Sequence, residues 1–251
     1  MADKELANRV AIVTGSGRNI GRAIALTLAA GGAAVVVNAR GNKAEADAVV
    51  GEIKKSGGKA VAVLGDVAEA ATGEKLAAAA MERFGRIDFL VNNAAIRAEK
   101  PLDAITFDDW RRILGVILDG AFHNVKAAMP HLKRSGAGAI VNIGGLSAHH
   151  GSKDRVHVIT AKAGIVGFTR GLAADLAADN VTVNCVVPGL IATKRTATAP
   201  EPQHHSVNHT LTGQRGTPED IAATVRFLCG PGARYITGQA IHVNGGAYLG
   251  S

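Results

Sequence analysis

The amino-acid sequence predicts an α/β protein built on one doubly wound parallel β-sheet. Three observations predict this fold class. The chain has 251 residues, which suits one large domain. Short apolar runs alternate with amphipathic stretches from one end of the chain to the other. A glycine-rich turn follows the first apolar run and opens the first helical stretch, as in Rossmann-type folds.

The expected strands are short runs, rich in β-branched residues and apolar on both faces, which is typical of a sheet covered on both sides. They fall at 10–14, 34–38, 60–64, 87–93, 139–143, 181–186 and 240–244. The main helical stretches fall at 42–56, 70–84, 107–134 and 156–178. Since this alternation implies right-handed βαβ crossovers, we predict a sheet of about seven strands with helices on both faces.

The chain shows no linker, repeat or low-complexity segment, so residues 1–251 are expected to form a single domain. The one irregular region is 190–216, which is too long for an ordinary connection. We expect this region to act as a substrate loop or lid.

Charge and composition narrow the class of partner. The net charge is +7, but the basic residues are scattered, and the chain has one Trp, two Tyr and six Phe to stack on bases. We therefore expect no nucleic-acid partner. A phosphate-bearing small ligand or an acidic substrate accounts for the positive charge equally well.

The cysteines and the hydrophobic runs indicate a cytoplasmic protein. Cys185 and Cys229 are isolated thiols, which fits a reducing compartment. The first residues, "MADKELANRV", are polar and charged and do not resemble a signal peptide. No apolar stretch reaches the ~18 residues that a membrane-spanning helix needs.

The stretch "VAIVTGSGRNIGRAIALTLAAGGAAVVV" is arranged as strand, glycine turn, helix and strand. Backbone N–H groups at the start of such a helix attract a pyrophosphate, and glycines let the ligand approach the backbone. Gly15 and Gly21 occupy two such places. A glycine turn in this position predicts a dinucleotide site.

Several motifs in the right order give the chain, over nearly its whole length, a resemblance to the short-chain dehydrogenase/reductase family. They are "TGSGRNIG" (14–21), "GDV" (65–67), "NNAA" (92–95), "VVPGLIATK" (186–194) and "TGQAIHVNGG" (237–246). Asn19 replaces the middle glycine of the first motif, and Asn244 stands where Asp is commoner. Asn tolerates left-handed backbone angles, so the first change is compatible with binding. Within the family, the chain is similar to 3-oxoacyl-carrier-protein reductase-like members.

The resemblance implies a set of residues that contact a nicotinamide cofactor. They are Gly15, Arg18, Asn19, Ile20, Gly21, Asn38, Arg40, Asp66, Val67, Asn93, Ala94, Lys162, Pro188, Gly189, Ile191 and Thr193. A carboxylate at the end of the second strand would favour NAD(H) by holding the ribose 2′-hydroxyl. This chain has Asn38, Ala39 and Arg40 there, and Arg18 could face the same place. We therefore expect NADP(H) rather than NAD(H), because a guanidinium pairs well with phosphate.

The catalytic residues of the family are altered. In the family a tyrosine donates a proton, a lysine four residues later lowers its pKa, a serine thirteen residues before it holds the carbonyl oxygen, and an asparagine positions a water. Anchored on Lys162, the tyrosine position is Val158, the serine position is Gly145 and the asparagine position is Ile117. The resemblance thus implies a degenerate catalytic tetrad.

Other residues could supply the missing proton. Ser147 is a hydrogen-bond donor near the missing serine, and His150 is our first choice for the acid because histidine titrates near neutral pH. His157 would replace the tyrosine after a one-residue shift, but helical spacing opposes this. The expected catalytic residues are therefore Lys162, Ser147, His150 and His157. Further histidines expected near the substrate are His149, His204, His205 and His209, and we expect no metal site.

The expected pocket rim carries basic residues that either serve as ordinary solubilising surface charges or favour an anionic substrate. These residues are Arg97, Lys153, Arg155, Lys194 and Arg195.

Three functions are compatible with this sequence. The first is an NADP(H)-dependent oxidoreductase that acts on a carbonyl or alcohol without the usual Ser/Tyr pair. The second is a non-redox hydrolase, lyase or isomerase that uses histidines, and the third is a catalytically silent nucleotide-binding subunit. The resemblance also implies a symmetric homotetramer, or a dimer, formed through the helices at 107–134 and 156–178.

Overall fold

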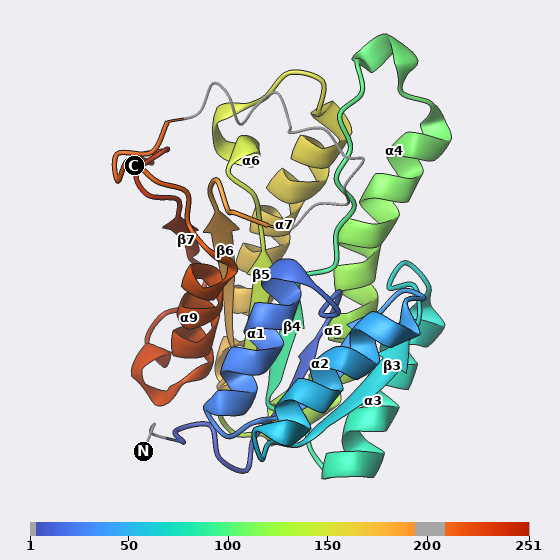
Figure 1. Cartoon of the computed structure of the whole chain (residues 1–251), viewed down its shortest axis with the longest axis vertical. Helices are drawn as coiled ribbons and strands as arrows, with labels where there is room; N and C mark the ends of the chain where they lie inside the picture. The colour runs from blue at the N-terminus through green and yellow to red at the C-terminus, as the bar shows by residue number, and fades with distance from the viewer. Residues whose placement is uncertain (1–3, 194–208, 251) are drawn as a thin grey trace.

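The computed structural model describes residues 4–193 and 209–250 (Figure 1). Its centre is a single seven-stranded sheet. The strands are β1 (Val10–Val13), β2 (Ala34–Ala39), β3 (Ala60–Leu64), β4 (Phe89–Asn92), β5 (Ala139–Ile143), β6 (Thr182–Pro188) and β7 (Ala240–Val243). Each strand overlaps one of the expected runs, so the predicted sheet is confirmed.

The strand order is β3–β2–β1–β4–β5–β6–β7, and every neighbouring pair is parallel. The order reverses between β1 and β4. Open α/β sheets bind ligands outside the carboxyl ends of their strands at such a point. In Figure 1 the arrowheads of β6 and β7 mark this carboxyl edge.

Helices cover both faces of the sheet, as predicted. They are α1 (Asn19–Ala30), α2 (Lys43–Lys55), α3 (Ala70–Phe84), α4 (Phe107–Leu114), α5 (Gly120–Arg134), α6 (Ser147–His150), α7 (Val156–Leu176) and α9 (Pro218–Cys229). Shorter turns are the 3-10 helices η1 (Leu102–Ala104), η3 (Ala177–Asp179) and η4 (Pro231–Ala233) and the π-helical η2 (Gly115–Asp119).

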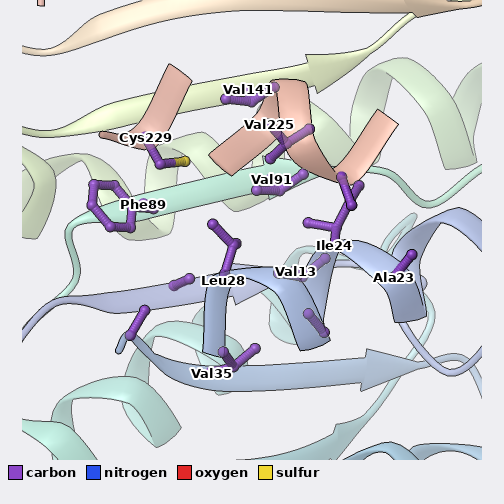
Figure 2. Close-up of a cluster of buried hydrophobic side chains, with 14 of the residues drawn as sticks. Val13, Ala23, Ile24, Leu28, Val35, Phe89, Val91, Val141, Val225 and Cys229 are labelled. Carbon is purple, nitrogen blue, oxygen red and sulfur yellow. The ribbon is translucent and has the colours of Figure 1, made fainter. Parts of the chain in front are cut away.

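One face of the sheet is covered by α1, α2 and α9. Figure 2 shows Leu28 of α1 and Val225 of α9 next to Val91 of the central strand β4. These side chains and Phe89 are buried in one apolar cluster. Burial of apolar surface of this kind is the main force that holds helices to a sheet.

The opposite face is covered by α3, α5 and α7. Leu76, Leu132 and Leu176, one from each helix, are buried in a second cluster with Ile12 and Leu90 of the sheet. Helices cover both faces of the sheet, and this explains why the central strands are apolar on both sides. The edge strands β3 and β7 are only partly buried, which the sequence pattern did not distinguish.

The predicted helix at 107–134 runs without a break but is not uniform. It begins at a capping box, in which Thr106 and Asp109 each accept a backbone hydrogen bond from the other. Its middle turn, η2, is π-helical, with Gly115 at its start and Gly120 directly after it. Glycine is a poor helix former, and π turns recur at functional sites.

The expected substrate loop at 190–216 is described only in part, because residues 194–208 lie outside the described residues. At its two ends, Ile191 forms a parallel bridge with Gly216. Within residues 4–193 and 209–250, no helix combines the length and the hydrophobicity needed to cross a bilayer.

Candidate active site

A cavity of about 1040 Å³ lies along the carboxyl edge of the sheet. It is lined by the turn between β1 and α1 and by residues that follow β2, β3, β4, β5 and β6. All sixteen residues expected to contact a cofactor line it, although they come from segments up to 178 positions apart, from Gly15 to Thr193. The fold therefore gathers the whole predicted set around one space.

The glycine turn is shaped by close backbone approaches. A side chain on Gly21 would collide with the carbonyl oxygen of Gly15, and Gly15 itself has a φ of +58°. Asn19 has a φ of 48°, which is the left-handed conformation expected for the residue in place of the middle glycine. Asn19 therefore keeps the backbone path that a glycine would take.

The start of α1 offers its backbone N–H groups to the cavity. Arg18 occupies the N-cap position but makes no side-chain capping hydrogen bond, and the first turn contains no acidic residue. The positive end of the helix dipole is thus not balanced by the helix itself. Such an end fits a pyrophosphate.

Asn38 plays a more internal part than the sequence predicts. It is buried, with its Oδ1 accepting a hydrogen bond from the N–H of Gly15 at 3.1 Å. Its Nδ2 donates to the carbonyl oxygens of Val63 and Gly65. Asn38 lines the cavity, but its side chain ties the glycine turn to the end of β3.

The "NNAA" segment is held by a buried polar network. Asn92 Nδ2 donates to Asn142 Oδ1 at 2.9 Å, and Asn92 Oδ1 accepts from Asn124 Nδ2 at 3.2 Å. The neighbouring Asn93 donates through Nδ2 to the carbonyl oxygens of Thr14 and Gly15. These bonds fix β4 against β1 and β5 at the switch point.

One end of the cavity carries Arg18 and Arg40, both exposed to solvent. Asp66 at this end accepts a hydrogen bond from Arg112 at 2.7 Å. Burial opposes ionisation of Asp66, but the bonds from Arg112 and from the backbone of Ala68 outweigh it and lower its pKa. Glu45 also lines this end, so the positive charge there is partly balanced.

Lys162 lies at the other end, on α7. Its side chain is buried, and its Nζ donates to the carbonyl oxygen of Ile143 at 2.6 Å. Burial lowers the pKa of Lys162 to about 8, and the nearby Arg97 and Arg155 act in the same direction. The ammonium is therefore easier to deprotonate than an ordinary lysine.

The positions expected for the tyrosine and the asparagine are occupied by apolar residues that pack in the protein interior. Val158 lies one helical turn before Lys162 and lines the cavity. Ile117 packs with Val158 and Ala161 in a buried cluster. Ile117 itself is not among the cavity-lining residues, whereas its neighbour Val116 is.

Ser147 is the one predicted proton donor other than Lys162 that lines the cavity. It begins α6 and is 7% exposed. Gly145 lines the same region, and a Cβ placed on it would meet only the side chain of Lys162. Ser147 and Lys162 therefore face one space.

The histidines differ from expectation. The expectation that His150 lines the pocket is not met, because its exposed side chain at the end of α6 lies near Tyr248 instead. His157 is buried outside the cavity lining, as helical spacing indicated, since its position on α7 turns it away from the face of Val158 and Lys162. His149 packs against His242 of β7, with ring centroids 4.5 Å apart. None of the described histidines lines the cavity.

Neither tyrosine replaces the missing one. Tyr235 is fully exposed, and Tyr248 packs against His242 with ring centroids 5.1 Å apart. Neither is among the cavity-lining residues. In the described part of the chain, no group of three or more His, Cys, Asp or Glu residues could hold a metal ion.

The expected basic rim is present in part. Arg97 and Arg155 line the cavity, whereas Lys153 is exposed and outside its lining. His209 is also exposed and outside the lining. The remaining expected residues, Lys194, Arg195, His204 and His205, lie outside the described residues.

Sequence reasoning missed Arg112, Glu45 and Glu99, which also line the cavity. Arg112 and Glu45 lie on amphipathic helices, and the sequence pattern gives no reason to distinguish them from ordinary solvent-exposed charged residues. No local sequence signal distinguishes a charged residue that lines the cavity at the edge of the sheet from a charged residue elsewhere on the surface.

Known proteins match this chain over nearly its whole length. A sequence model of the family described as Enoyl-(Acyl carrier protein) reductase matches residues 15–248. The chain is 42% identical over 246 residues to a 3-oxoacyl-[acyl-carrier-protein] reductase of Synechocystis sp., covering 97% of this chain and 98% of that protein.

Two solved structures resemble the fold closely. A blue fluorescent protein from a metagenomic library, crystallised with NADPH, has a TM-score of 0.91 and 35% identity, covering 98% of this chain and 100% of that one. A short chain dehydrogenase from Burkholderia cenocepacia, crystallised with NADP, has a TM-score of 0.90 and 35% identity, covering 97% and 99%.

Proposed function

This chain belongs to the short-chain dehydrogenase/reductase family, and from that premise we propose that it is an NADP(H)-dependent oxidoreductase acting on a carbonyl or alcohol substrate. The observation that carries the proposal is the single cavity that Lys162 lines together with the other fifteen expected cofactor contacts. The uncapped start of α1 and the close approach at Gly21 fit a bound dinucleotide.

The preference for NADP(H) rests on charge. No acidic residue stands at the end of β2, and Arg18 and Arg40 both line that end of the cavity. These guanidiniums would hold a 2′-phosphate through paired, charge-assisted hydrogen bonds. The two relatives crystallised with NADPH and NADP support the same choice.

We assign the roles of the family's serine and tyrosine, which hold the carbonyl oxygen and transfer the proton, to Ser147 and Lys162. When bound, the nicotinamide cofactor supplies or accepts the hydride. Ser147 would donate a hydrogen bond to the substrate oxygen, because it is a buried serine that lines the cavity. Lys162, with a pKa of about 8, would give up or take the proton near neutral pH. His150, our first choice from the sequence, lies outside the cavity lining.

A specific observation favours a second candidate, the catalytically silent nucleotide-binding subunit. Val158 and Ile117 share one apolar cluster, so the usual proton relay has no polar atom there. The histidine-based non-redox enzyme has no comparable support, since no described histidine lines the cavity.

The test is NADPH fluorescence quenching, followed by a panel of carbonyl compounds monitored by the absorbance of reduced nicotinamide. Tight binding with turnover supports the oxidoreductase, and tight binding without turnover favours the silent subunit. Gly21→Ala is the matched negative control, because the added methyl group would collide with the carbonyl oxygen of Gly15. Absence of binding for both NADPH and NADH would contradict the whole proposal.

We also propose a homotetramer, or a dimer, located in the cytoplasm. Phe107 of α4, Phe122 of α5 and Val156 of α7 are exposed apolar residues on the helices expected to meet a partner. Both cysteines are buried free thiols, which suits a reducing compartment. Analytical ultracentrifugation of the wild type and of Phe122→Glu tests the assembly.

A further inference from the structure

A buried guanidinium lies at the catalytic end of the cavity. Arg155 directly precedes α7, three residues before Val158, and lines the cavity. Its residue is only 8% exposed, although arginine is one of the residues least often buried. Burial lowers its pKa, with Glu99 acting in the opposite direction. Keeping a charge in such a place is costly, so a function for it is expected.

Two further cationic residues, Arg97 and Lys162, line the same end of the cavity. Arg97 lines the cavity, and its Nη1 donates to Thr193 Oγ1 at 3.5 Å. Arg97 and Arg155 both lower the pKa of Lys162, so the three charges lie within electrostatic reach of one another. Glu99 is the one described carboxylate lining this end. Positive charge therefore exceeds negative charge where the substrate would react.

We propose that Arg155 binds a carboxylate group of the substrate, with Arg97 contributing from the exposed side. This assignment rests on the proposed function, because it places the substrate beside the nicotinamide end of the cavity. The planar guanidinium presents two parallel N–H groups that match the two oxygens of a carboxylate. The start of α7 adds the positive end of a 21-residue helix.

The position of Arg155 also limits the substrate class. Arg155 and Val158 are separated by less than one helical turn, and Val158 and Lys162 by about one turn. A carboxylate held by Arg155 therefore lies close to the carbonyl that reacts near Lys162. The substrate class is a short oxo acid, in which the ketone and the carboxylate are separated by at most a few carbon atoms.

Titration calorimetry on the NADP⁺-saturated protein tests this without requiring turnover. The probes are 2-oxobutyrate and acetoacetate, each compared with its methyl ester. We expect each acid to bind at least about tenfold more tightly than its ester, because only the acid has a carboxylate that can accept charge-assisted hydrogen bonds. Arg155→Gln should remove this difference, and Arg155→Lys should restore part of it.

The matched control is Lys153→Gln, which removes an exposed cation two residues away that lies outside the cavity lining. It should leave the acid-to-ester ratio unchanged. If Arg155→Gln fails to fold, as judged by circular dichroism, the acid–ester comparison on the wild type and on Arg155→Lys still decides. Equal affinities for acid and ester overturn the proposal, as does an equal effect of the two glutamine substitutions.

Two further experiments distinguish a carboxylate from a phosphate as the bound group, and a failure of this inference from a failure of the proposed function. Dihydroxyacetone phosphate tests a phosphate in place of the carboxylate, and tighter binding of this probe would overturn the oxo-acid assignment. A preceding titration with NADPH and NADP⁺ tests the proposed function separately. If neither nucleotide binds, the proposed function fails, and the same acid–ester comparison on the cofactor-free protein still tests Arg155.

Discussion

A Cβ atom placed on Gly145 would lie 3.6 Å from the Cγ of Lys162, which is ordinary van der Waals contact. The serine position of the family is therefore open in this chain and faces its lysine. Val158, the tyrosine position, lines the same cavity one helical turn before Lys162. Two of the three altered positions, those of the serine and the tyrosine, thus border the open cavity.

Restoring both residues should raise activity. We expect Gly145→Ser combined with Val158→Tyr to increase carbonyl reduction by about a hundredfold or more, the usual contribution of a positioned acid. Steady-state rates with NADPH measure the effect. Gly145→Ser with Val158→Phe is the control, since it adds the ring without the hydroxyl. Equal rates for the two double variants would show that the phenol plays no part.

Ser147 and His150 should behave differently although they lie three residues apart. Ser147→Ala should lower the rate by about tenfold or more, because it removes the hydroxyl of a residue that lines the cavity. His150→Ala should leave kcat and KM unchanged, since this exposed residue lies outside the lining. The reverse pattern in steady-state kinetics would reinstate His150 as the acid.

Arg40 and Arg18 should set cofactor preference. Arg40→Ala is expected to weaken NADPH binding by about tenfold and to leave NADH binding nearly unchanged, because only NADPH carries the 2′-phosphate. Arg18→Ala should act in the same direction. Lys43→Ala is the control, as Lys43 pairs with Asp47 on α2 and does not line the cavity. Equal losses for the two nucleotides would contradict this assignment.

Asn19 should tolerate glycine but not valine. Its φ of 48° is accessible to glycine, whereas a β-branched residue there is strained by about 1–2 kcal/mol. Asn19→Gly should keep NADPH affinity and thermal stability near wild type, and Asn19→Val should lower both. Fluorescence titration and thermal unfolding measure the two effects. A valine variant that behaves like the glycine variant would show that the backbone conformation is unimportant for binding.

Lys162 should make stability depend on pH. Its pKa is about 8 in the folded protein, against an ordinary value of 10.5. Between these values the unfolded chain holds more protons, so the free energy of unfolding rises with pH relative to a variant without the amine. Below the lower value the cost of burying the charge is fully present.

Lys162→Met should therefore be more stable than the wild type near neutral pH, and the difference should shrink as the pH rises above about 8. Chemical denaturation at several pH values measures it. Burial raises the pKa of Cys185 to about 11, and it lies near Lys162, so the comparison is best made below the range in which this thiol ionises. A difference that stays constant with pH would show that Lys162 is not desolvated.

The sequence by itself determined the order and type of the elements and the set of residues that line the cavity beside the glycine turn. Alternating apolar runs predict buried parallel strands, and the position of Gly15 and Gly21 after the first run predicts the tight turn that opens α1, because both signals depend only on neighbouring residues. The altered residue pattern around Lys162 is likewise a matter of spacing along one helix.

Only the tertiary structure decided which polar side chains face the cavity. Ser147 and His150 share a four-residue helix, yet one lines the cavity and the other is exposed. Arg155 and Lys153 are two residues apart and differ in the same way. In short helices and loops, side-chain direction is set by packing against distant segments, and sequence spacing carries no record of those contacts.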